Sequence, residues 1–159
     1  MMKFNADDIF EMAEEIEREG AKFYRKAAEN ACCDTAREML TKLAKMEDEH
    51  LETFTQMRGQ LSGGEIKATV FDPEGEAALY LQAFADGKVF DRSVAPSEKL
   101  TGSESSDEIL RIAIGLEKDS IAFYLGIKNL VPAQLGRERL DAIITQEMDH
   151  IRILSGGMS

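Results

Sequence analysis

The chain has 159 residues, a length that fits a single domain with one sizeable core. Its 19 Lys and Arg residues against 30 Asp and Glu residues give a formal net charge of −11, which argues against nucleic acid or an anionic membrane as a partner, because both need a basic surface. Ala, Leu, Glu, Lys and Met are plentiful while valine is scarce, so the composition predicts an all-α protein.

The N-terminal segment 1–8 lacks the basic stretch and following apolar stretch of a signal peptide. The sequence also has no apolar run of about 18 residues, the length that a helix needs to cross a membrane. We therefore expect a soluble protein of the cytoplasm.

Residues 6–58 are predicted to form a hairpin of two helices. Asn5 or Asp7 is expected to cap the first helix, and its acidic first turn suits a helix N-terminus. Inward-facing positions recur every three or four residues on both sides of a turn near residues 30–34, which is the spacing of buried helical stripes.

The turn of this hairpin contains both cysteines of the chain, Cys32 and Cys33, and Asp34 or Thr35 is expected to cap the helix that follows. Neighbours in sequence seldom pair with each other as a disulfide. Two thiols are also too few for a four-thiolate zinc or iron site. We expect Cys32 and Cys33 to be reduced thiols near a helix end.

Residues 59–104 are predicted to be a long, irregular crossover around one short helix, which begins near Asp72-Pro73 and ends near Asp86-Gly87. A segment of this length can cross a four-helix bundle from end to end, about 35–40 Å for helices of about 25 residues. The sequence leaves open whether the short helix packs across the bundle, covers an entrance or joins a second subunit.

Residues 105–155 are predicted to form a second helix hairpin. Ser105 and Glu108 fit a capping box at its start, and Pro132 stands where the first turn of a helix tolerates proline. Two hairpins joined by one long crossover predict a four-helix bundle.

An internal repeat supports this arrangement. Residues 7–54 align without a gap with residues 107–154, with 11 identities in 48 positions. The two histidines of the chain, His50 and His150, fall on each other, and a Glu precedes each by three positions. We therefore expect the two hairpins to pack with pseudo-twofold symmetry.

Four glutamates and two histidines interrupt the inward-facing stripes: Glu17, Glu47, His50, Glu117, Glu147 and His150. In each hairpin one Glu lies 15 residues before the centre of the turn and the other 15 after it, so both reach the same height on antiparallel helices. Each His shares a helix face with the Glu three positions earlier. All six side chains are therefore predicted to meet in the middle of the bundle.

The predicted cluster points to bound metal. Four ionised carboxylates buried together repel one another and lose their hydration. Two divalent cations balance four carboxylates and leave both imidazoles neutral, and oxygen-rich donors with one nitrogen per metal suit iron or manganese. A solvated helix face, a core histidine or a snorkelling Glu accounts for any one of these residues, but not for six at matched positions.

Two tyrosines accompany the predicted site. Tyr24 and Tyr124 lie seven residues after Glu17 and Glu117, two turns along the same helix face. Their hydroxyls are expected either to bond to a liganding carboxylate of a facing helix or to lie at the rim of an ordinary aromatic core.

These motifs resemble the rubrerythrin branch of the ferritin-like di-iron carboxylate superfamily, over about 100 of the 159 residues and without clear extension into the crossover. The resemblance implies a ferritin-like four-helix bundle that holds two iron ions between terminal and bridging ligands. The terminal carboxylates would be Glu17 and Glu117, the bridging ones Glu47 and Glu147, and the imidazoles, one for each iron, His50 and His150.

The resemblance also implies an oxidoreductase whose iron reacts with hydrogen peroxide or dioxygen. It favours peroxide reduction, with one electron from each of two Fe(II) ions. Rubrerythrins proper carry a rubredoxin-like domain with two C-x-x-C pairs, which this chain lacks, so we expect electrons from a separate donor protein. Ser120 stands where the family has an extra carboxylate after the Glu117 position, which predicts a more symmetric site.

Other functions use the same six ligands. One is a ferroxidase centre for iron storage or delivery, and another is a metal that only braces a non-catalytic bundle. The sequence does not distinguish iron from manganese or zinc, and the usual affinity order favours zinc. We expect a homodimer or a higher homo-oligomer, in which the long crossover permits exchange of hairpins between subunits.

Overall fold

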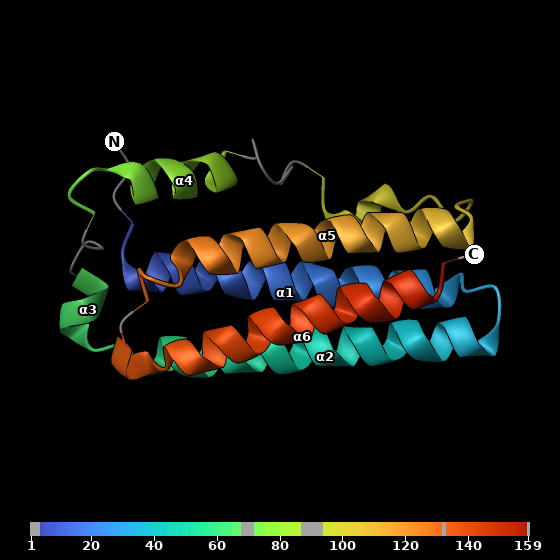
Figure 1. Ribbon diagram of the computed structural model, residues 1–159, viewed down its shortest axis with the longest axis horizontal. Coiled ribbons are helices and arrows are strands. Elements are labelled where there is room, and N and C mark those ends of the chain that lie inside the picture. Colours follow the sequence, from blue (N-terminus) through green and yellow to red (C-terminus); the bar gives the residue numbers. More distant parts are fainter. Residues whose placement is uncertain (1–3, 68–71, 87–93, 132, 159) are drawn as a thin grey trace.

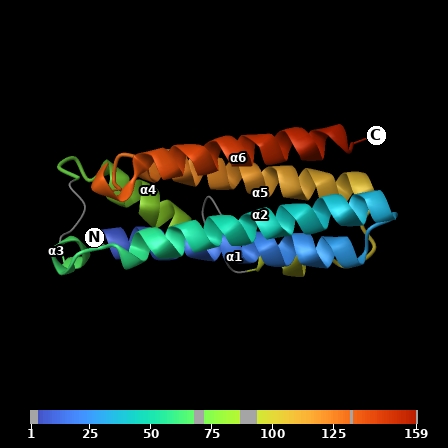
Figure 2. The same ribbon diagram turned by 90° about the horizontal axis from the view of Figure 1, so that it is seen from below.

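The computed structural model describes residues 4–67, 72–86, 94–131 and 133–158. Within these residues all the secondary-structure elements are helices, and there is no β-strand. Four long helices lie side by side (Figure 1): α1 (Ala6–Glu29), α2 (Asp34–Gly59), α5 (Ser106–Ile127) and α6 (Arg137–Gly156). α1 packs against α2 and α5, and α6 packs against α5 and α2 (Figure 2). The predicted all-α bundle of two hairpins is confirmed.

Capping boxes fix where the first helix of each hairpin begins. The Asn5 side chain accepts a hydrogen bond from the Asp8 backbone N–H, and the Asp8 carboxylate accepts one from the Asn5 N–H, both at 2.9 Å. Ser105 and Glu108 make the same reciprocal pair at the start of α5. Each box satisfies N–H groups that the first turn of a helix leaves without a partner.

The predicted cap of α2 was wrong. The extended residue before this helix is Cys33, with φ −156° and ψ 167°, so Asp34 is already helical. The Asp34 carboxylate pairs with Arg37 at 2.8 Å instead of capping a backbone N–H. Within the described residues, the Cys33 side chain at the N-cap position makes no capping hydrogen bond to α2.

The crossover contains the predicted short helix and two shorter elements that the sequence did not predict. These are α3 (Gly63–Lys67), α4 (Glu76–Ala85) and the 3-10 helix η1 (Pro96–Lys99); a second 3-10 helix, η2 (Ala133–Leu135), precedes α6. The Asp72 carboxylate accepts hydrogen bonds from two N–H groups in the first turn of α4, which explains why the helix starts after it. The predicted stop at Gly87 and the role of Pro132 lie outside the described residues.

α4 packs along α5, as Figure 1 shows at one end of the bundle. Leu81 and Phe84 of α4 join the core, and Phe84 meets Phe123 edge-on at 5.1 Å between ring centroids. The Tyr80 hydroxyl donates a hydrogen bond to the backbone carbonyl of Ala122. At Gly126 a Cβ atom would lie 2.1 Å from the Tyr80 ring, so this ring can lie against α5 as it does only because residue 126 is glycine.

The core consists of two apolar clusters at opposite ends of the bundle. One contains Phe10, Phe54, Phe123 and Leu140 with the α4 side chains. The other contains Phe23, Leu43, Leu110 and Leu154. Between the two clusters lies a layer of buried polar groups, and that layer contains the candidate site.

Candidate metal centre

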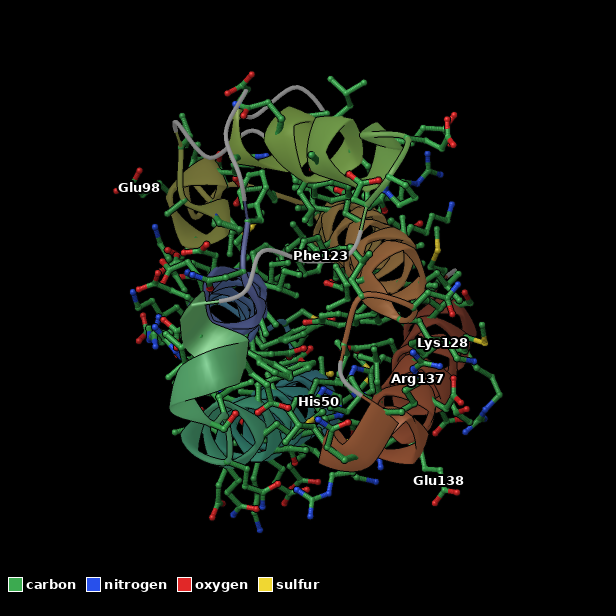
Figure 3. All side chains as sticks on the ribbon, turned by 90° about the vertical axis from the view of Figure 1, so that its left-hand side faces the viewer. His50, Glu98, Phe123, Lys128, Arg137 and Glu138 are labelled. Carbon is green, nitrogen blue, oxygen red and sulfur yellow. The ribbon has the colours of Figure 1, made fainter. Side chains whose placement is uncertain are left out.

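The structure brings all six predicted ligands together at mid-height of the bundle. α1 and α5 contribute one glutamate each, and α2 and α6 contribute a Glu and the His one turn later. Every one of them is at most 3% exposed: Glu17, Glu47, His50, Glu117, Glu147 and His150, hereafter the Glu/His cluster. In the end-on view of Figure 3, His50 lies inside the bundle between α2 and α6.

The cluster divides into two overlapping halves. His50 Nδ1 lies 3.2 Å from carboxylate oxygens of both Glu47 and Glu147 and 3.4 Å from one of Glu17. His150 Nδ1 lies 2.9–3.5 Å from carboxylate oxygens of Glu147, Glu117 and Glu47. Glu47 and Glu147 therefore take part in both halves, while Glu17 and Glu117 each take part in one.

Each half offers four donor atoms that lie within 4.8 Å of one another. One half is formed by Glu17, Glu47, His50 and Glu147, the other by Glu47, Glu117, Glu147 and His150. Three carboxylates and one imidazole around a common point are the oxygen-rich donor set that suits iron or manganese. Two carboxylates shared between neighbouring sets are the arrangement of a di-metal site.

Several buried polar atoms of the cluster lack a hydrogen bond. Within the described chain this holds for one oxygen each of Glu47 and Glu147, for Nδ1 of His50 and for both ring nitrogens of His150. A buried polar atom without a partner is destabilising by about 1–3 kcal/mol. All of these atoms except His150 Nε2 belong to the two donor sets or face them, so two cations would give them partners. The residues present therefore fit a di-metal centre.

The pKa values of the buried carboxyl groups and imidazoles also reflect the repulsion between the clustered carboxylates. Burial, together with the charge of neighbouring carboxylates, raises the pKa of Glu17 and of Glu147 from 4.5 to about 8. Burial opposes a charged imidazole, yet three surrounding carboxylates raise the pKa of His150 to about 12 and raise that of His50 as well. Without metal, protons thus take over the neutralising role, and metal binding would displace them.

Both tyrosines hydrogen-bond across the bundle to the cluster. The Tyr24 hydroxyl donates to the Glu117 carboxylate, and the Tyr124 hydroxyl donates to Glu17. Burial first, and then the nearby carboxylates, raise the pKa of both phenols, so each remains a donor. The carboxylate bond expected for these tyrosines is therefore present, and each tyrosine orients the Glu that belongs to one half alone.

Gln146 is a neighbour of the site that the sequence did not reveal. Its side-chain oxygen lies 2.6 Å from His50 Nε2, so this nitrogen donates its hydrogen and Nδ1 is directed at the carboxylates. The matching position in the first repeat is Met46, and His150 Nε2 has no such acceptor within the described chain. A signal for Gln146 was present in the sequence, because it aligns with Met46 although the next residues, Glu147 and Glu47, are matched ligands.

Little free space adjoins the carboxylates. A cavity of about 10 Å³ lies beside Glu17, Glu47 and Glu117, with Gly20 and Ser120 in its wall. That volume corresponds to about one water molecule. The Ser120 hydroxyl donates to the Leu116 carbonyl at 3.0 Å rather than to the cluster. On the opposite side, His50 and Gln146 lie at the wall of a groove of about 350 Å³ between α2 and α6.

Comparison with solved structures finds the same fold in a ferritin-like protein. A candidate ferritin-like diiron-carboxylate protein of Thermotoga maritima superposes with a TM-score of 0.72 at 24% identity, over 98% of this chain and 95% of that chain. No protein-family model matches the sequence, and no curated protein matches it. No helix of the described part is long and apolar enough to cross a membrane.

Proposed function

We propose that this chain is a rubrerythrin-like di-iron protein that reduces hydrogen peroxide with electrons from a separate donor protein. One observation carries the proposal: the buried Glu/His cluster forms two donor sets that share Glu47 and Glu147. Two divalent ions in these sets balance four carboxylates, and two iron ions that each pass from Fe(II) to Fe(III) supply two electrons.

The proposed roles follow from position. Glu17 and Glu117 would each bind one metal, Glu47 and Glu147 would bridge, and each histidine would bind through Nδ1. When bound, two Fe(II) ions supply one electron each, enough to reduce one peroxide to two waters. Tyr24 and Tyr124 hold the terminal carboxylates and keep a proton on each phenolic oxygen beside them.

Peroxide is favoured over an organic substrate by the size of the space beside the carboxylates. A cavity of about 10 Å³ gives no room for an organic molecule, whereas a peroxide is little larger than the water that fits there. The larger groove of about 350 Å³ borders His50 but none of the four carboxylates. The two cysteines of this chain form no pair of C-x-x-C motifs, and the proposal takes the electrons from a separate donor.

The test is anaerobic loading with Fe(II), followed by rapid mixing with peroxide. We expect about two irons per chain, oxidised together by one equivalent of peroxide, and repeated turnover once a reductant is added. Iron that oxidises with dioxygen but not with peroxide would make the chain a ferroxidase. Two metals that remain inert to both oxidants would leave only a structural role and would overturn the proposal.

A further inference from the structure

Cys32 and Cys33 form a pair of exposed thiols in the turn between α1 and α2. Their sulfur atoms lie 3.7 Å apart, which is close contact between two thiols that are not bonded to each other. The pair is separate from the Glu/His cluster, because 13 residues of α2 lie between Cys33 and Glu47, roughly 20 Å of helix.

The fold itself does not account for these thiols. Cys33 occupies the N-cap of α2, where Ser, Asp or Asn would bond to the first turn, and no such side-chain bond is formed within the described chain. In the second repeat the matching residues are Pro132 and Ala133, so the hairpin can be built without cysteine. Both positions are exposed, which leaves no packing role.

The surroundings favour a thiolate. Cys33 precedes the first turn of α2, and Cys32 interacts with Ser106, the first residue of α5. The pair therefore lies between two helix N-termini, whose dipoles stabilise negative charge. The hydrogen bond with Ser106, and a second with Cys33, lower the pKa of Cys32, and the thiolate is the nucleophilic form of cysteine.

An apolar pocket of about 430 Å³ opens beside the pair. Cys32 and Cys33 lie in its wall together with Ala36, Met39, Leu40 and Leu110. Pockets of about 300–1,000 Å³ with mostly apolar walls and a few polar groups are typical of small-molecule sites. Here the groups that can react with a bound molecule are the two sulfur atoms.

We propose that Cys32 and Cys33 are a redox-active dithiol that reduces organic hydroperoxides whose apolar substituent occupies this pocket. The Cys32 thiolate attacks the terminal peroxide oxygen, the O–O bond breaks, and the alkoxide leaves as an alcohol after it takes up a proton. Cys32 is then a sulfenic acid. The Cys33 sulfur attacks it, the S–S bond forms and water leaves, so two electrons pass from sulfur to one hydroperoxide.

The product disulfide is suited to turnover rather than to a structural role. Consecutive Cα atoms are about 3.8 Å apart, closer than the roughly 4.4–6.8 Å usual for disulfides. A disulfide between neighbours is therefore strained, and strained, exposed disulfides are readily reduced by other thiols. An external thiol would return the pair to the dithiol state.

The first experiment uses the full chain freed of metal by a chelator, so that only sulfur can supply electrons. One equivalent of cumene hydroperoxide should consume both thiols, remove two hydrogen atoms from the mass of the monomer, and be reversed by dithiothreitol. Cys33→Ser should stop at the sulfenic acid, which a dimedone probe traps. Unreactive thiols, or disulfides formed only between chains, would overturn the proposal.

A second experiment tests whether the pocket binds the apolar part of the substrate. The wild-type thiols should react faster with cumene hydroperoxide than with hydrogen peroxide by about tenfold or more, because even one methylene group in an apolar pocket contributes about tenfold to discrimination. Ala36→Phe fills the pocket, so it should slow the reaction with cumene hydroperoxide more than the reaction with hydrogen peroxide and bring the ratio of the two rates close to one. Equal rates for both oxidants in the wild type would refute the assigned substrate class.

Discussion

At the scale of single residues, the two halves of the Glu/His cluster are alike in their donors and unlike in their support. Tyr24 and Tyr124 orient the terminal carboxylates of the two halves in the same way. Within the described residues, only His50 has a side-chain acceptor behind its ring, because Gln146 stands where the first repeat has Met46. Since such partners fix the orientation of a liganding imidazole, the two metal positions should differ in affinity.

Replacing Gln146 should therefore weaken one metal position and spare the other. Gln146→Leu keeps the size of the side chain and removes the acceptor for His50 Nε2. We expect the affinity for one of two ions to fall by about 10–100-fold in an anaerobic Co(II) or Fe(II) titration. Met46→Leu is the matched control at the equivalent position and should leave both binding steps unchanged. An equal loss at both positions would contradict the assigned role.

The terminal glutamates should increase the affinity for metal and decrease the stability of the metal-free protein. Glu17→Gln removes a charge from a carboxyl group whose burial raises its pKa to about 8, while an amide oxygen can still accept from Tyr124. At pH 8.5 in chelator the variant should melt a few degrees higher than the wild type, since about 1 kcal/mol corresponds to roughly 2–4 °C in a chain of this size.

Metal content provides the second readout for this variant. Loaded Glu17→Gln should retain less than two ions per chain, because an amide is a weaker ligand than a carboxylate. A variant that melts lower than the wild type in chelator and still binds two ions would show that Glu17 serves the fold rather than a metal.

At the scale of helices, the sequence predicted the elements whose apolar pattern repeats over many residues. It missed the features that depend on a single turn or a single contact. The four long helices and the convergence of six side chains follow from periodicity and equal rise. The capping box of Ser105 and Glu108 follows from its sequence pattern, whereas the sequence offered Asn5 only as a cap and did not predict its box with Asp8. Short elements such as α3 and η1 carry no periodic signal, because one turn has no repeat to detect. The start of α2 depended on whether Cys33 or Asp34 adopts the extended conformation, which composition alone cannot decide.

The packing of α4 on α5 should depend on the missing side chain at position 126. Gly126→Ala would place a Cβ atom 2.1 Å from the Tyr80 ring, so Tyr80 must move and its bond to the Ala122 carbonyl should be lost. We expect faster amide hydrogen exchange in α4 (Glu76–Ala85) and a lower melting temperature. The measurement is hydrogen exchange by mass spectrometry at the level of peptides.

Gly115 supplies the control within the same helix. Apart from its chain neighbours and the backbone of its own helix, nothing in the described chain lies within 4 Å of a Cβ atom built there. Gly115→Ala should therefore raise stability by roughly 0.5–1 kcal/mol, the gain expected for Ala over Gly inside a helix. If Gly126→Ala stabilised the protein in the same way, the close approach of α4 would not be what glycine permits.

At the scale of the whole molecule, the fold places a polar layer between two apolar clusters and so couples its stability to what neutralises that layer. Protons do so in the absence of metal: the carboxyls of Glu17 and Glu147 have pKa values of about 8 in the folded chain against 4.5 for the free groups. His150 likewise keeps its proton up to about pH 12. In each case the folded chain binds more protons than the unfolded chain over the intervening range.

The sign of the pH dependence follows. The contribution of Glu17 and Glu147 is fully present below about pH 4.5 and is lost as pH rises to about 8. That of His150 is present below 6.5 and is lost as pH rises toward 12. The pKa of Glu117 is lowered: burial opposes this shift, but the neighbouring His150 and Glu147 side chains outweigh it, and the contribution of Glu117 to stability is lost only as the pH falls below about 4.5.

Metal-free protein should accordingly melt at a lower temperature at pH 8.5 than at pH 6, and metal-loaded protein should show the smaller change. Because metal displaces these protons, the gain in melting temperature on loading should grow with pH. Differential scanning calorimetry with chelator and with saturating Mn(II) at both pH values measures it. Glu17→Gln removes one of the titrating carboxyls, so its metal-free form should lose less stability over the same range; a slope equal to that of the wild type would exclude Glu17 as a source of the effect.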